Sequence, residues 1–374
     1  MANYSAFLNS KYVKEILVHY SPKNKIMPTA KIYFFNLSLM IATVSCSQPQ
    51  SIGQESKKQN DIIENIVTQF NNNYVFPEVA EEMGAHLYNQ LEKEAYAGLD
   101  SKEFAAQLTE DMRSITNDKH VRINHVERDA NDKPTNSLLD MHKRFKNYGF
   151  EESKILEGNI GYIDLRLFFP INTDTKAKII VQEIMSEMAT TDALIFDLRK
   201  CVGGSPEMIS LLVSYLYPED TIIHLNNFFY RPTNSTFKSY TLKEIDGNRF
   251  PHMPVYILTG AKTFSAAEEF CYDLKNLKRA TLVGVNTGGG AHTVEPRKIN
   301  NDFEMSIPTG RAINPISNTN WEGVGVTPHW EVSEEQALTK AHMLAVESLA
   351  KSNVNAEQIA IYQALIQKLR IETN

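Results

Sequence analysis

The spacing of apolar residues divides the chain into a helical first part and a mixed second part. Between Asp61 and Thr116, apolar residues recur every three or four positions in three runs, as in helices with one buried face. The stretch "NNNYVFP" separates the first two runs, and Asp100 or Ser101 can cap the third at its N-terminus. The pattern predicts a small three-helix bundle.

From Asn159 onward, strand-like and helix-like segments alternate. Buried strands are predicted at "IGYIDL", "ALIFDL", "PVYILT" and "ATLVGV", with helices at 176–188, 206–216 and after Ser265. This alternation implies an α/β domain with a mostly parallel sheet. The segments "TIIHLNNFFYRP" and "STFKSYTL" are predicted to pair as strands, "GVGV" at 323–326 is strand-like, and a long amphipathic helix begins near Glu334.

Changes in composition along the chain suggest where the parts meet. We expect a signal segment at 1–46, a flexible polar tether at 47–60, an N-terminal helical domain at 61–126, a polar connector at 127–156, and an α/β domain with a C-terminal helix at 157–374.

The N-terminal segment resembles a bacterial lipoprotein signal. Two lysines precede an apolar run from Ile32 to Val44, which is too short for a membrane span but suits a signal peptide. Cys46 follows and is the predicted lipidated residue, although Thr43 stands where leucine is usual and Met27 is an alternative start. We predict export to the cell envelope and a lipid-anchored protein on the periplasmic or outer-membrane face. A plain cleaved signal and a buried helix are the alternatives.

The overall composition excludes several classes of partner and cofactor. A net charge of −7 without a Lys/Arg run argues against nucleic acid as a partner. The three cysteines are too few for a disulfide framework, and no CxxC motif or His/Cys cluster suggests zinc. We expect neither a metal nor an organic cofactor.

Ser265 stands where a predicted strand turns into a predicted helix, in "VYILTGAKTFSAAEEF". Such a junction exposes the hydroxyl and leaves the N–H of Ala266 free to stabilise an oxyanion. The simpler interpretation of this stretch alone is a helix cap. The GxSxG motif of esterases is absent.

Gly203 and Gly204 lie in a second turn between a strand and a helix, after "IFDLR". Glycine allows a substrate to approach the backbone N–H groups closely, so this loop is a candidate for the second oxyanion donor. An ordinary connecting loop is the alternative. The sequence matches neither GxGxxG nor a P-loop, which disfavours nucleotide binding.

Two histidines are candidates for a general base. His120, in "NDKHVRI", follows the third helix, and His292 follows "TGGGA". Glu322, in "NWEGVGV", is a carboxylate that could orient a catalytic histidine, or simply a solvated loop residue.

Taken together, these segments resemble the C-terminal processing (tail-specific) serine peptidases. The similar runs are "GYIDLRLF", "DALIFDLRKCVGGSPEMISLLVSYL", "PVYILTGAKTFSAAEEFCYDLKNLKRATLVGVNTGGGAH" and "NWEGVGVTPHWEV". "NNYVFPEVAEEM" and "DKHVRI" resemble the helical domain of the branch that includes the interphotoreceptor retinoid-binding protein repeats and lies close to the tricorn catalytic core. The resemblance implies a crotonase/ClpP-like core, Ser265 as nucleophile, and Gly203 and Gly204 in the oxyanion loop.

The chain departs from the better-known branch of this family, which uses a Ser-Lys dyad and carries a PDZ domain. Gly290 occupies the position of the lysine, and no room remains for a PDZ domain. The tricorn-like arrangement implies His120 as base and Glu322 as its distant partner, with His292 as the rival base. Lys119 stands where tricorn has a linking serine.

We therefore predict a serine-type peptidase that acts on peptides or unfolded proteins in the cell envelope. The alternative is a non-catalytic protein that binds hydrophobic ligands or peptides on the same scaffold.

Overall fold

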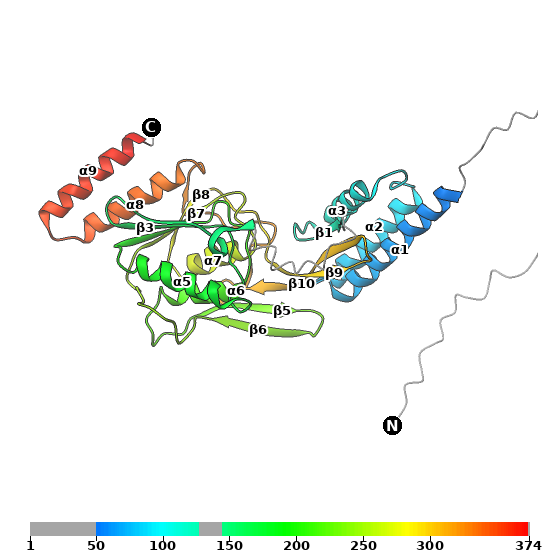
Figure 1. Cartoon of the computed structure of the whole chain (residues 1–374), viewed down its shortest axis with the longest axis horizontal. Coiled ribbons are helices and arrows are strands. Elements are labelled where there is room, and N and C mark those ends of the chain that lie inside the picture. The colour runs from blue at the N-terminus through cyan, green and yellow to red at the C-terminus, as the bar shows by residue number, and fades with distance from the viewer. Residues whose placement is uncertain (1–49, 127–143, 373–374) are drawn as a thin grey trace, which may run out of the picture. The chain divides into compact units, whose positions relative to one another are not determined.

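The computed structural model describes residues 50–126 and 144–372 (Figure 1). The predicted signal segment, with Met27 and Cys46, and most of the predicted connector lie outside these residues. Within the described ranges, no helix is both long and apolar enough to cross a membrane.

Three helices form the N-terminal region, as predicted: α1 (Gln50–Asn73), α2 (Pro77–Glu92) and α3 (Ser101–Thr116). Their apolar faces share one core, which includes Ile66, Phe70, Met83 and Leu108. Helix α1 begins at Gln50, so the prediction of a flexible tether is wrong for residues 50–60. Those residues are rich in Gln, Glu and Lys, whose helix propensity extends α1 beyond its apolar stripe.

A short loop after α3 carries His120, one of the candidate bases, and the two ends of this helix are well defined. Asp100 is the N-cap, and its carboxylate accepts hydrogen bonds from the backbone N–H groups of Lys102 and Glu103. At the other end, Asn117 adopts the left-handed conformation and stops the helix. The loop at residues 118–121 then leads into strand β1 (Arg122–His125).

The main sheet has six strands and is parallel except at one edge, which confirms the predicted fold class. Its order is β11-β8-β7-β4-β3-β2, with only β2 antiparallel. The strands are β2 (Phe150–Leu156), β3 (Ile160–Leu165), β4 (Ala193–Asp197), β7 (Val255–Thr259), β8 (Thr281–Gly284) and β11 (Trp330–Glu331). A short 3-10 turn, η1 (Lys146–Gly149), precedes β2. Strand β2 shows that the prediction of a connector is wrong for residues 150–156.

Helices cover both faces of this sheet (Figure 1). On one face, the largest core packs α5 (Thr175–Met188), α6 (Pro206–Ser214) and α7 (Ala266–Asn276) against the strands. On the other face lie α8 (Ala337–Ser352) and α9 (Ala356–Glu372). The predicted single C-terminal helix is thus two helices, separated at residues 353–355.

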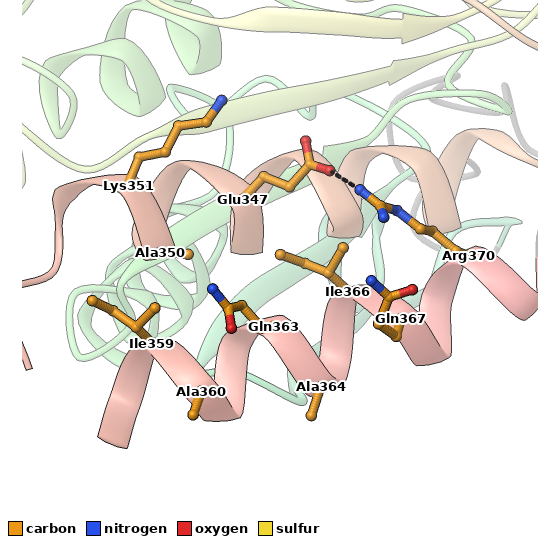
Figure 2. A pocket seen from close by; sticks show the side chains of 10 residues that line it. All are labelled: Glu347, Ala350, Lys351, Ile359, Ala360, Gln363, Ala364, Ile366, Gln367 and Arg370. Carbon is orange, nitrogen blue, oxygen red and sulfur yellow. Dashed lines mark hydrogen bonds and ion pairs between the residues drawn. The ribbon is translucent and has the colours of Figure 1, made fainter. Parts of the chain in front are cut away.

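An open groove of about 800 Å³ lies between α8 and α9 (Figure 2). Glu347 and Arg370 form an ion pair across it, at 3.5 Å. None of the predicted site residues lines this groove, so we assign no chemistry to it.

A second, antiparallel sheet connects the helical region to the α/β core. It contains β5 (His224–Tyr230), β6 (Ser235–Tyr240), β9 (His292–Lys298) and β10 (Phe303–Ile313), together with β1. The first half of β10 pairs with β1 and its last residues pair with β5. The predicted β5–β6 pairing is confirmed. The prediction of a strand at 323–326 is wrong, because these residues form a turn and an extended loop.

Candidate active site

Ser265 lies in a strained turn at the start of α7. Its backbone has φ 56° and ψ −124°, a combination that residues other than glycine rarely adopt. Such a conformation costs roughly 1–3 kcal/mol and persists only where the surroundings impose it. The neighbouring Thr263 helps to fix the turn, since its hydroxyl donates to the carbonyl of Leu198 at 2.7 Å and accepts from Gly260 N–H at 2.9 Å.

Glu268 connects this turn to the glycine-rich loop at residues 287–290. Its carboxylate is completely buried and accepts four hydrogen bonds. Oε2 accepts from the backbone N–H groups of Ser265 (2.9 Å) and Gly290 (2.8 Å). Oε1 accepts from the Thr287 hydroxyl (2.5 Å) and Gly289 N–H (2.6 Å). Burial raises the pKa of Glu268, while these hydrogen bonds partly oppose the shift.

Gly203 lies directly against the serine turn. A Cβ atom at this position would lie 2.8 Å from Ser265 Cβ and 3.1 Å from Ala266 N, and φ at Gly203 is +105°. Gly204 has φ +134°, and a Cβ there would overlap the Phe168 backbone. Only glycine meets these demands at both positions. The structure thus brings the predicted oxyanion residues Gly203 and Ala266 together with Ser265.

Asp118, which was not among the predicted site residues, forms a cluster with His120, His292 and Glu322. Asp118 accepts from the backbone N–H of His120 at 2.9 Å, and its Oδ2 lies 2.6 Å from His292 Nδ1. The Nδ1 atom of His120 lies 3.6 Å from Asp118 Oδ1, and Glu322 Oε2 lies 3.6 Å from His292 Nδ1. Both predicted bases and Glu322 therefore belong to one cluster.

The charges in this cluster shift one another's pKa values. Burial disfavours the charged form of Asp118, but the neighbouring His120 and His292 outweigh it and lower the pKa. Burial likewise opposes the charged form of His292, yet Asp118 and Glu322 raise its pKa overall. Burial raises the pKa of Glu322, with the charge of His292 opposing. The site therefore favours an Asp118 carboxylate beside a His292 that tends to hold a proton.

His120 belongs to the Asp118 cluster and also contacts the serine turn. Its ring packs against that of Phe264, the residue before Ser265, with centroids 4.6 Å apart. The His120 side chain is only 7% exposed, and neither ring nitrogen has a hydrogen-bond partner within the described residues. Gly290 makes this packing possible, because a Cβ there would overlap the Phe264 ring and lie 2.7 Å from His120 Cε1.

Lys119 does not take the place of the linking serine. Its ammonium group donates to the carbonyl of Gly288 at 2.6 Å and so points to the glycine-rich loop. The carboxylate of Asp118 instead connects the two histidines. The sequence signal for Asp118 is the pattern Asp-x-His. In this pattern, the short acidic side chain commonly accepts a hydrogen bond from the backbone N–H two residues further along.

The two described cysteines are not candidates for the nucleophile. Cys201 and Cys271 are free and fully buried. Burial raises the pKa of the Cys201 thiol to about 12 and that of Cys271 well above its usual value. Because the thiolate is the reactive form, neither residue suits catalysis.

Comparisons with known proteins identify the family. Residues 159–332 match peptidase family S41, and residues 46–149 match the N-terminal domain of peptidase S41 in eukaryotic IRBP. The chain therefore belongs to peptidase family S41, and this membership supports a serine-type peptidase. Only residues 150–158 separate the two matches, so no PDZ domain lies between them, as predicted.

Two solved structures share the fold. A lipoprotein from Streptococcus agalactiae has 16% sequence identity and a TM-score of 0.56, over 77% of this chain and 96% of that chain. A putative peptidase from Parabacteroides merdae has 19% identity and a TM-score of 0.55, with the same coverage of both chains. At these identities the likeness shows the shared fold.

Proposed function

We propose that this peptidase uses Ser265 as its nucleophile and His120 as its general base. The observation that carries the proposal is the strained Ser265 turn, which packs against Gly203 on one side while its neighbour Phe264 packs against the His120 ring. Strained serine turns between a strand and a helix are typical of hydrolytic nucleophiles.

The proposed reaction is acyl transfer followed by hydrolysis. His120 removes the proton of the Ser265 hydroxyl as the serine oxygen attacks the peptide carbonyl carbon. Backbone N–H groups at Gly203, Gly204 and Ala266 stabilise the oxyanion. The protonated His120 then gives its proton to the leaving amine. His120 next deprotonates a water molecule, which attacks the acyl-enzyme, and finally returns the proton to Ser265.

Asp118 is the proposed positioning residue for His120. Its buried carboxylate accepts from the His120 backbone and lies 3.6 Å from the ring nitrogen Nδ1, so it can stabilise the imidazolium that forms during attack. Glu322 acts on this site indirectly. Its Oε2 accepts a hydrogen bond from Ala291 N–H and lies 3.6 Å from His292 Nδ1.

Gly290 supports a Ser-His site rather than a Ser-Lys dyad. The space that a side chain at position 290 would need is occupied by the Phe264 and His120 rings. A lysine at this position and the observed placement of His120 therefore exclude each other.

His292 is the weaker candidate for the base. Its Nδ1 is engaged by Asp118 at 2.6 Å, and its ring packs edge-on against Phe76, with centroids 5.5 Å apart. We propose that His292 holds Asp118 in place rather than accepting the serine proton.

We further propose that the protein is exported and anchored through Cys46, and that it cleaves peptides or unfolded proteins in the cell envelope. The support is the apolar run and the Ser45-Cys46 junction. Labelling cells with a palmitate analogue tests the anchor. The wild-type protein should carry the label and Cys46→Ala should not; an unlabelled wild-type protein contradicts the anchor.

Substitution of the nucleophile tests the catalytic proposal. Ser265→Ala should abolish hydrolysis of an unfolded protein substrate and labelling by a fluorophosphonate probe, with little change in Tm. Ser235→Ala, at an exposed serine on β6, is the matched control and should keep both signals. Undiminished hydrolysis by Ser265→Ala would rule out the assignment. Bound lipid without probe labelling in the wild-type protein would favour the non-catalytic alternative.

A further inference from the structure

Asp118, His120 and Glu322 come together from distant parts of the sequence in the arrangement of a metal site. One ligand atom from each residue lies within 4.8 Å of the other two. Asp118 and His120 come from the loop after α3, and Glu322 comes from the loop between β10 and β11. A small closure of the side chains would bring all three atoms to the distance of about 2.0–2.2 Å at which Zn²⁺ binds nitrogen and carboxylate oxygen.

Several polar atoms of this cluster lack a partner. Both ring nitrogens of His120 and the Oε1 atom of Glu322 are buried without a hydrogen bond within the described residues. The His120 side chain is more than nine-tenths buried. Since buried polar atoms almost always have a partner, these atoms are available to a further polar ligand.

The donor set selects the kind of ion. One imidazole nitrogen with two carboxylates suits Zn²⁺ and similar transition-metal ions, which take three protein ligands and keep an open fourth position. Ca²⁺ and Mg²⁺ prefer oxygen ligands in sixfold or higher coordination, which a site with an imidazole does not supply. We propose that Asp118, His120 and Glu322 bind a single Zn²⁺-class ion, and that this ion inhibits the peptidase.

The inhibitory part follows from the position of His120. A metal ion shared with Asp118 binds the His120 nitrogen beside that carboxylate. The neutral imidazole then carries its proton on the other nitrogen, which can no longer accept the proton of Ser265. This part rests on the proposed function, whereas the metal site itself does not. His292 lies outside the ligand set and supports it, because its Nδ1 lies 2.6 Å from Asp118 and so orients that carboxylate.

Direct metal binding by the full chain tests the site. Equilibrium dialysis with Zn²⁺, and absorption spectroscopy with Co²⁺ as a coloured substitute, should show one tight ion per wild-type chain and the same for Ser265→Ala. His120→Ala and Glu322→Gln should each weaken binding by about tenfold or more, since loss of even a supporting residue costs about that much. The control His252→Ala, at an exposed histidine, should bind normally. Thermal melts check that each variant is folded.

The outcomes separate this proposal from the proposed function. Absence of tight binding to the wild-type chain overturns the metal site, as does binding that His120→Ala and Glu322→Gln leave unchanged. The inhibitory role is supported if Zn²⁺ inhibits the peptidase and EDTA reverses the inhibition. The inhibition should also follow the same Zn²⁺ concentration dependence as the measured binding. Binding at the cluster without inhibition overturns that role. If Ser265→Ala keeps its activity, the proposed nucleophile fails, while metal binding by this variant still supports the site.

Discussion

The ring of His120 packs against the ring of Phe264, with centroids 4.6 Å apart and planes inclined at 40°. This contact joins the loop after α3 to the turn that carries Ser265. The two rings fill the space that a side chain at Gly290 would need. The observed position of the His120 ring therefore requires glycine at position 290.

Gly290→Ala should weaken both stability and activity. A methyl group at this position would overlap Phe264 and crowd His120, and overpacking of this kind costs about 1–3 kcal/mol. No positive φ is involved at Gly290, so the effect is steric. Urea denaturation and kcat/KM, measured on the same preparations, give the two quantities.

A double-mutant cycle checks the cause of this effect. Phe264→Ala removes the ring that the new methyl group would overlap, so the double variant should lose less stability than the sum of the single variants. Strict additivity would show that the two positions do not interact.

His120→Ala and His292→Ala should have different effects. Loss of a general base typically lowers the rate about 10²–10⁴-fold, which we expect for kcat of His120→Ala. His292→Ala should chiefly reduce stability, because it leaves the buried Asp118 carboxylate without its closest partner. Measuring kcat and Tm for both variants shows which of the two histidines is the general base. A folded His292→Ala with the larger loss in kcat would identify His292 as the base.

Glu268→Gln should destabilise the serine turn. The carboxylate accepts four hydrogen bonds, and an amide would direct its NH₂ group at two of these donors. A buried donor without an acceptor costs about 1–3 kcal/mol, so we expect a loss of this size in urea denaturation. Glu103→Gln, in the exposed capping box of α3, is the control and should change stability much less. Equal losses in the two variants would contradict the proposed anchoring role.

Glu269→Gln should change how stability depends on pH. Glu269 and Asp273 are buried together on α7; burial first, and then the charge of Asp273, raise the pKa of Glu269. The folded state therefore keeps a proton that the unfolded state releases above its ordinary pKa of about 4.3. Stability falls as pH rises from there toward the folded pKa, by at most about 1.4 kcal/mol per pH unit for one group.

The glutamine variant lacks this titration. Its stability relative to wild type should therefore increase between about pH 5 and about pH 8, as urea denaturation can measure. A constant difference over that range would mean that the pKa of Glu269 is the same in the folded and unfolded states.

Local patterns were sufficient for much of the fold. The three N-terminal helices and the buried parallel strands carry continuous or periodic apolar signals, and the structure confirms them. Strand β2 was missed because most of its residues are at least partly exposed at the edge of the sheet, which leaves no apolar run. Strand β10 was missed because Pro308 and Gly310 interrupt its alternation, and its pairing with β1 joins distant segments.

The sequence by itself determined the α/β class, the membership of a serine peptidase family and a short set of candidate residues. It did so because helix and strand periods, glycine turns and local motifs depend on neighbouring residues. Only the tertiary structure decided how His120, His292 and Glu322 are arranged and that Asp118 lies between them. Their contacts join residues up to about two hundred positions apart, and such contacts depend on the packing of whole elements, which no local pattern records.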